Sequence, residues 1–146
     1  MNLEENKRIK AAITAVGGYV PDTILSNQDL EKMVDTNDAW ITSRTGIKER
    51  RILKDDQKPT SYLAIKAAEN LLSKSAIDPS SIDLLIVATV TPDMPVAATA
   101  AYVASEIGAT NAFAFDLNAA CSGFLYGMSI CAAYIRSGQY KRVLLI

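Results

Sequence analysis

The sequence of 146 residues contains no histidine and only two cysteines. With so few of the usual ligands, it cannot assemble a zinc-type cluster, and we expect no metal site. Cys121 and Cys131 are ten positions apart in one predicted helix. This corresponds to about 15 Å along the axis at ~1.5 Å per residue, which is too far for a disulfide between them. Two unpaired thiols fit a reducing compartment.

The sequence also lacks three patterns that would indicate other classes of protein. No apolar run approaches the roughly 18 residues of a membrane span. Residues 1–8 lack the basic-then-apolar order of a secretory signal. The 15 basic residues are interspersed among 16 acidic ones, so that no sustained positive patch is available to bind nucleic acid. We therefore expect a cytoplasmic protein that binds neither membrane nor nucleic acid.

Apolar stretches and helical patterns alternate along the chain. Strands are predicted at 9–16, 84–90, 112–117 and 142–146, with an extended segment at 47–53. Helices are predicted at 26–33, 37–46, 60–74, 96–107 and 121–137. Ser26 and Asp29 resemble a capping box at the first of these helices. This order predicts an α/β domain with a mainly parallel sheet covered by helices.

The chain stops inside the apolar segment Val143–Ile146, without a turn or polar tail after it. A natural domain rarely ends within a strand. We therefore expect residues 1–146 to be the first part of a longer protein.

Cys121 is the candidate nucleophile. It lies among small residues in the segment Asn118–Phe124, where a predicted strand gives way to a predicted helix. Unpaired N–H groups in the first turn of a helix, together with the helix dipole, favour a thiolate over a thiol. Its small neighbours leave room for a substrate. The alternative interpretation is an inert buried cysteine that packs as a small apolar residue.

Five segments in order resemble the beta-ketoacyl-acyl-carrier-protein synthase III family. These segments are Gly18–Pro21, Asp35–Ile41, Arg44–Ile47, Ala88–Thr89 and Asp116–Phe124. The resemblance implies a thiolase-like fold, in which two pseudo-symmetric βαβα halves form five αβαβα layers. Residues 1–146 would be the N-terminal half.

The resemblance also implies an activity for the whole protein. Cys121 would take an acyl group from acetyl-CoA or another short acyl-CoA, which is a substrate and not a permanently bound cofactor. Condensation with malonyl-acyl carrier protein would follow with loss of carbon dioxide, giving a beta-ketoacyl product. The family is homodimeric and uses a histidine and an asparagine from the second half. The 146-residue piece alone is therefore predicted not to complete condensation.

In the family, the counterpart of Trp40 stacks on the adenine of CoA, and those of Thr36 and Arg44 help to hold the nucleotide. An indole face and a guanidinium suit a base and a phosphate. The alternative is a core tryptophan with a capping Thr36 and a solvated Arg44.

Two sulfur-containing residues have different interpretations. Met94 corresponds to a loop residue that projects toward the acyl pocket of the dimer partner, where a flexible apolar side chain could influence chain length. The alternative is a surface methionine. Cys131 matches no catalytic position of the family, and we interpret it as structural packing.

Other functions remain open at this point. One alternative is a related thiolase-superfamily acyltransferase of secondary metabolism, or hydroxymethylglutaryl-CoA synthase. A second is an inactive fragment that forms part of a dimer. A third is a redox role for Cys121, for which no resolving cysteine lies nearby.

Overall fold

The computed structural model describes residues 9–54 and 58–146, which belong to two compact units. The first unit combines the residues up to Tyr19 with Pro59–Ile146, and the second comprises Val20–Lys58.

A three-stranded parallel sheet forms the centre of the first unit. Its strands are β3 (Leu84–Ala88), β4 (Phe113–Leu117) and β5 (Val143–Leu145), in the order β4-β3-β5. Leu85 of β3 lies opposite Ala114 of β4 and Leu144 of β5. The residues of the central strand from Leu84 to Val87 are almost completely buried, as the continuous apolar run predicts. The predicted parallel sheet is therefore confirmed.

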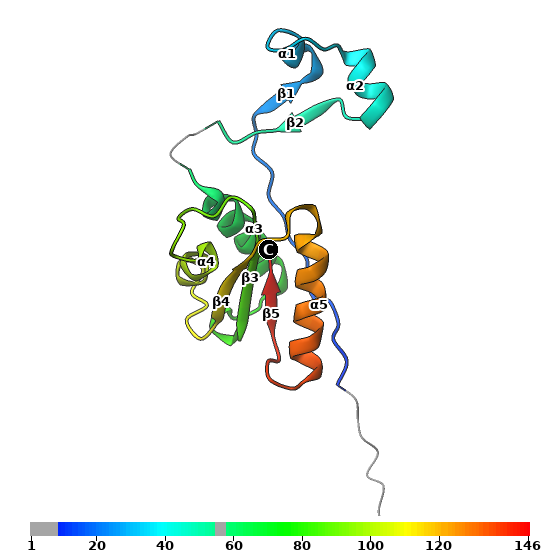
Figure 1. Ribbon diagram of the computed structural model, residues 1–146. Coiled ribbons are helices and arrows are strands. Elements are labelled where there is room, and N and C mark those ends of the chain that lie inside the picture. Colours follow the sequence, from blue (N-terminus) through cyan, green and yellow to red (C-terminus); the bar gives the residue numbers. More distant parts are fainter. Residues whose placement is uncertain (1–8, 55–57) are drawn as a thin grey trace, which may run out of the picture. The chain divides into compact units, whose positions relative to one another are not determined.

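Helices cover both faces of this sheet (Figure 1). They are α3 (Thr60–Ser75), α4 (Thr99–Glu106) and α5 (Gly123–Arg136), and short 3-10 turns occupy Pro79–Ser81 (η1) and Ala120–Ser122 (η2). Leu85 and Val87 belong to a buried cluster with residues of α3 and α4. On the opposite face, Gly127 of α5 lies against the side chain of Leu145. The sheet thus separates α3 and α4 from α5.

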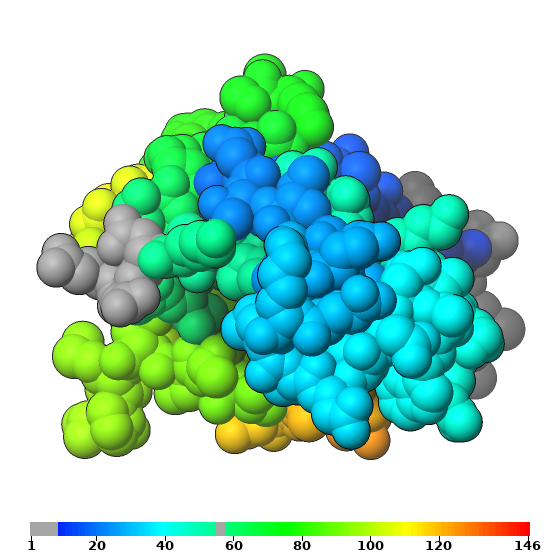
Figure 2. Space-filling view, turned by 90° about the horizontal axis from the view of Figure 1, so that it is seen from above, coloured from blue at the N-terminus to red at the C-terminus, as the bar shows by residue number. Residues whose placement is uncertain are grey.

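The second unit is a small α/β body, coloured blue to cyan in Figure 2. It contains β1 (Ile24–Ser26), α1 (Asn27–Glu31), α2 (Asp38–Thr45) and β2 (Glu49–Arg51). The two strands are antiparallel, and α1 contacts α2. Helix α2 begins after Asn37, whose side chain accepts a hydrogen bond from the Trp40 N–H, and ends at Gly46, which has a φ of 71°. Both caps agree with the helix predicted at 37–46.

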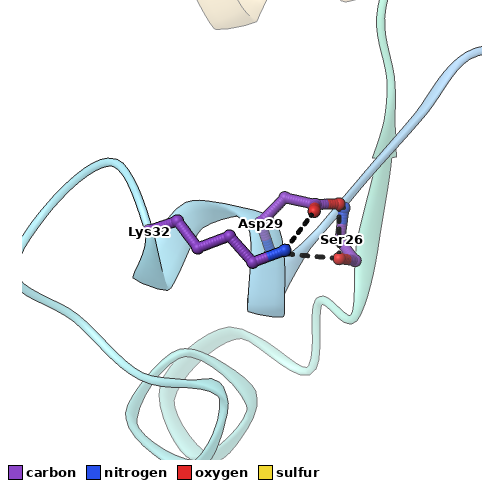
Figure 3. Close-up of polar contacts among 3 residues, drawn as sticks. All are labelled: Ser26, Asp29 and Lys32. Carbon is purple, nitrogen blue, oxygen red and sulfur yellow. Dashed lines mark hydrogen bonds and ion pairs between the residues drawn. The ribbon is translucent and has the colours of Figure 1, made fainter.

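The predicted capping box at α1 is confirmed (Figure 3). The Asp29 N–H donates to Ser26 Oγ at 3.1 Å, and the Ser26 N–H donates to Asp29 Oδ2 at 3.1 Å. Lys32 Nζ donates to Asp29 Oδ1 at 3.2 Å. The hydrogen bonds from Ser26, followed by that from Lys32, favour the carboxylate and lower the pKa of Asp29 to about 2.

Two predicted elements differ from the structure. Residues 9–16 are not a strand, although their composition favours one, because a strand needs a neighbouring backbone to pair with. Most of these residues are exposed, including the side chains of Ile13 and Val16. The predicted helix 121–137 is preceded by a 3-10 turn, so that Cys121 lies just before α5 and not inside it.

Candidate functional site

Cys121 lies between the carboxyl end of β4 and the start of α5. It is the central residue of η2, and it is exposed. Ala120, the residue before it, has a φ of 44°, a left-handed conformation that is uncommon for alanine. This tight, strained turn presents the thiol at the carboxyl edge of the sheet, where ligands bind in open parallel α/β sheets. Cys121 is therefore not a buried packing residue in the described unit.

Small residues allow α5 to approach the ends of β3 and β4 closely. The Thr89 N–H donates to the carbonyl oxygen of Leu117 at 3.1 Å, which extends the pairing of the two strands to this edge. Gly123 is buried, and a Cβ on it would lie 3.4 Å from the Cβ of Ala88. A Cβ at position 123 would therefore just reach van der Waals contact with Ala88, which shows how closely the start of α5 approaches the end of β3.

Asp116, near the end of β4, caps helix α4, which precedes β4 in the sequence. Its Oδ2 accepts a hydrogen bond from the Thr99 N–H at 2.8 Å, and its Oδ1 accepts one from the Ala100 N–H at 2.7 Å. These N–H groups belong to the first turn of α4, which has no side-chain cap from its own N-cap residue. In the sequence, Asp116 belongs to a segment that resembles the family but has no predicted role of its own. The feature of the sequence that could have indicated this role is an acidic residue near the end of an apolar strand.

The loop that carries Met94 is held by a second aspartate. The Asp93 N–H donates to Thr99 Oγ1 at 3.0 Å, and Asp93 Oδ1 accepts a hydrogen bond from the Ser61 N–H at the start of α3, also at 3.0 Å. Met94 follows this anchored residue, and its side chain is 54% exposed. The hydrogen bonds of Asp93 thus hold the backbone of Met94 in a loop at the carboxyl edge. The Met94 side chain lies outside the buried core.

Trp40 and Arg44 form a stacked pair on α2 in the second unit. The guanidinium carbon of Arg44 lies 4.8 Å from the centre of the Trp40 ring, a cation–π distance. Trp40 is 53% exposed, so it is not the core tryptophan of the alternative interpretation. Thr36 is half-buried and precedes the N-cap residue Asn37. The structure therefore brings Trp40 and Arg44 together and places Thr36 at the start of the same helix.

The candidate residues divide between the two units. Cys121 and Met94 belong to the first unit, and Thr36, Trp40 and Arg44 belong to the second.

Cys131 has a different environment from Cys121. It lines a cavity of about 620 Å³ in the first unit, together with apolar residues of α3, α5 and β5, whereas neither Cys121 nor Met94 lines this cavity. Partial burial raises the pKa of the Cys131 thiol. The packing role of Cys131 stays a prediction. Within residues 9–54 and 58–146, no cluster of three histidine, cysteine, aspartate or glutamate residues could hold a metal ion.

The helices in the described ranges include none with the length and apolar composition needed to cross a membrane.

A family model matches the C-terminal part of the chain. The family model described as 3-Oxoacyl-[acyl-carrier-protein (ACP)] synthase III matches residues 115–146, which include η2 and α5.

Individual relatives match most of the chain. This chain is 58% identical to the beta-ketoacyl-[acyl-carrier-protein] synthase III of Chlorobium chlorochromatii over 138 residues. These residues are 94% of this chain and 42% of that protein. The crystal structure of 3-oxoacyl-[acyl-carrier-protein] synthase III from Aquifex aeolicus has a TM-score of 0.85 and 46% identity, covering 90% of this chain and 42% of that one. The priming beta-ketosynthase of the R1128 polyketide pathway has a TM-score of 0.84 and 37% identity, covering 90% and 39%. The chain thus spans less than half the length of these proteins.

Proposed function

We propose, from the premise that this chain is a homologue of part of beta-ketoacyl-[acyl-carrier-protein] synthase III, that its whole protein is a condensing enzyme that initiates fatty acid synthesis. The fold is the thiolase-like α/β fold of the solved relatives. The observation that carries the proposal is the exposed Cys121, placed by a strained turn at the carboxyl edge of the parallel sheet.

Residues 1–146 are proposed to be the N-terminal half of that enzyme. The second half would complete the five αβαβα layers and supply the histidine and asparagine of the decarboxylation step. The coverage of 42% of the curated relatives supports this division.

The reaction proposed for Cys121 has two stages. In the first, the thiolate attacks the carbonyl carbon of acetyl-CoA or a short acyl-CoA, a C–S bond forms, and the CoA thiolate leaves and takes up a proton. In the second, malonyl-acyl carrier protein loses carbon dioxide. The resulting enolate carbon bonds to the acyl carbon and releases Cys121. Backbone N–H groups, that of Cys121 among them, would stabilise the oxyanion of the first stage.

Thr36, Trp40 and Arg44 are proposed to hold the nucleotide of CoA. The exposed indole offers surface for the adenine, and the guanidinium stacked beside it offers hydrogen bonds to phosphate. Met94 is proposed to contribute to the acyl pocket of a dimer partner. Acyl-CoA acts as a substrate in this scheme, without a resident cofactor, and the protein is proposed to be a cytoplasmic homodimer.

A related thiolase-superfamily reaction is the second candidate. The similarity to a priming beta-ketosynthase of a polyketide pathway favours an acyltransferase of secondary metabolism among these alternatives. Hydroxymethylglutaryl-CoA synthase would share the acyl-cysteine and differ in the acceptor. Malonyl-acyl carrier protein as the productive acceptor distinguishes the leading proposal from this one.

The first prediction concerns acylation. We expect the full-length protein incubated with acetyl-CoA to gain the mass of one acetyl group, located on Cys121 by peptide mass spectrometry. Cys131→Ala is the matched control, because it removes the other thiol and should retain the label. Cys121→Ala should abolish it. An unlabelled Cys121 would refute the proposal, and rapid sulfenic acid formation at Cys121 without acylation would favour the redox role.

A condensation assay with acetyl-CoA and malonyl-acyl carrier protein, applied to residues 1–146 alone, distinguishes an enzyme half from a complete catalyst. We expect this piece not to condense malonyl-acyl carrier protein, since it has no histidine. Measurable condensation by it would contradict the assignment of the remaining catalytic residues to the second half.

A further inference from the structure

Asn27 is the most deeply buried polar residue of the second unit, with 0% of its surface exposed. It is the first residue of α1, and its backbone N–H donates to the carbonyl oxygen of Lys48 at 3.2 Å. Its side chain therefore begins at the junction of β1, α1 and β2. A buried amide at such a point is costly unless its donors and acceptor are all used.

The side-chain amide of Asn27 satisfies both of its polar atoms. Its Oδ1 accepts a hydrogen bond from Arg50 Nη1 at 2.5 Å. Its Nδ2 lies 2.7 Å from Asp38 Oδ1 and 2.8 Å from the carbonyl oxygen of Ile47. Because one contact is a cationic donor and the others are acceptors, the orientation of the amide is determined.

A third acceptor lies near the same nitrogen. Thr42 Oγ1 is 3.3 Å from Asn27 Nδ2, but the amide nitrogen has only two hydrogens, and the two shorter contacts use them. The Thr42 hydroxyl donates instead to Asp38 Oδ1 at 3.2 Å. The contacts to Asp38 and Ile47 are therefore the two that matter most.

These two contacts hold both ends of α2. Asp38 is the first residue of the helix, and Ile47 follows its C-cap, Gly46. At about 100° per residue, Asp38 lies about 200° around the helix from Trp40, so the two side chains project from nearly opposite faces. Anchoring the Asp38 face thereby sets the direction of the Trp40 face.

We propose that Asn27 is the positioning residue that orients the Trp40–Arg44 face of α2 toward the nucleotide of the acyl-CoA substrate. The inference rests on the proposed function, because it takes Trp40 and Arg44 as nucleotide contacts. Asn27 itself acts through the helix and touches no substrate.

Asn27→Asp is the sharpest variant, because it keeps the shape of the side chain and removes both donors. The new carboxylate would face the Asp38 carboxylate and the Ile47 carbonyl, while the contact with Arg50 would remain. Thr42→Val is the matched control, since it keeps the two shorter contacts of Asn27 and removes only the Thr42 hydroxyl, which donates to Asp38 and lies 3.3 Å from Asn27 Nδ2. Thermal unfolding midpoints establish that each variant is folded. If Asn27→Asp does not fold, Asn27→Ser, which is too short to bridge Asp38 and Ile47, replaces it in the same comparison.

The experiment compares two acyl donors in the full-length protein. Acetyl-CoA carries the nucleotide, and acetyl-pantetheine has the same thioester without it. We expect Asn27→Asp to raise KM for acetyl-CoA about tenfold, the equivalent of one lost hydrogen bond, while kcat/KM for acetyl-pantetheine changes less than about twofold. Thr42→Val should stay within about twofold for both donors.

Trp40→Ala separates the failure of this inference from the failure of the proposed function. If Trp40→Ala raises KM for acetyl-CoA and Asn27→Asp does not, the nucleotide site stands and the role of Asn27 is refuted. If Asn27→Asp loses activity equally with both donors, Asn27 contributes only to general stability, and its proposed positioning role is also refuted. If Trp40→Ala leaves KM for acetyl-CoA unchanged, the nucleotide assignment fails, and the inference fails with it.

Discussion

Asp116 uses both of its carboxylate oxygens to bind the first turn of α4, at 2.8 and 2.7 Å. Such contacts satisfy N–H groups that a helix cannot satisfy itself, and a carboxylate additionally complements the positive end of the helix dipole. The residue connects the strand before Cys121 with the helix that follows β3.

We expect Asp116→Asn to lower the free energy of unfolding by about 1 to 2 kcal/mol, because an amide offers only one acceptor to two N–H groups. Urea denaturation of the full-length protein measures this change. Glu106→Gln is the control, since Glu106 is an exposed carboxylate in the last turn of the same helix, and it should have little effect. Equal stability of Asp116→Asn and the wild type would show that the cap contributes nothing.

The separation in sequence between partners decides which polar contacts can be predicted. Ser26 and Asp29 are three residues apart, so the capping box could be recognised from the sequence. The partners Asp116 and Thr99 are 17 residues apart, and Asn27 and Arg50 are 23 apart. Contacts of this kind depend on how whole elements pack, and local patterns carry no information about them.

At the scale of elements, the apolar run of β3 and the glycine and asparagine caps of α2 were sufficient to predict a strand and a helix. Residues 9–16 have a similar composition but form no strand in the described structure. Whether such residues form a strand depends on whether an unpaired sheet edge lies beside them, and composition alone does not determine this.

Gly17 shows how this segment is held. A Cβ at Gly17 would lie 2.6 Å from the backbone nitrogen of Leu71 in α3, whereas one at Gly18 would meet nothing within 4 Å. Backbone atoms of a helix cannot move aside as the end of a flexible side chain can. The chain therefore runs against α3 at a point where only glycine fits.

We expect Gly17→Ala to lower the free energy of unfolding by about 1 to 3 kcal/mol, the usual cost of overpacking, while Gly18→Ala costs little. Hydrogen exchange at the N–H of residue 18, which donates to Asn70 Oδ1 of α3 at 3.2 Å, should accelerate in the first variant, because the added methyl group separates the segment from α3. Indistinguishable exchange in the two variants would contradict this close approach.

At the scale of the whole molecule, the absence of histidine shapes the response to pH. No side chain of the 146 residues has an ordinary pKa near 6.5, and the described shifts lie elsewhere. Hydrogen bonds from Ser26 lower the pKa of Asp29 to about 2. Hydrogen bonds from Ser80 lower the pKa of Asp78, and N–H groups of Arg142 and Lys141 lower that of Asp83.

A carboxyl group with a lowered pKa stabilises the folded state above its unfolded pKa, and this contribution is lost as the pH falls through the folded value. Burial raises the pKa of Cys131, so its contribution is present at neutral pH and is lost as the pH rises through the raised value. We therefore expect the unfolding temperature of residues 1–146 to be nearly constant from about pH 5 to pH 8 and to fall below about pH 4. Calorimetry across this range measures it, and a step near pH 6.5 would contradict the expectation.

Three helices, α3, α4 and α5, begin near the carboxyl edge of the sheet, and their N-terminal N–H groups differ in what they bind. Asp93 accepts from the first turn of α3, and Asp116 accepts from that of α4. The N-cap residue of α5, Ser122, makes no side-chain cap hydrogen bond. Two of the three positive helix ends are therefore neutralised by carboxylates, whereas the third has no such cap from its N-cap residue. The edge is thus electrostatically one-sided: for the proposed Cys121 thiolate, the adjacent end of α5 is the helix end that neither aspartate neutralises.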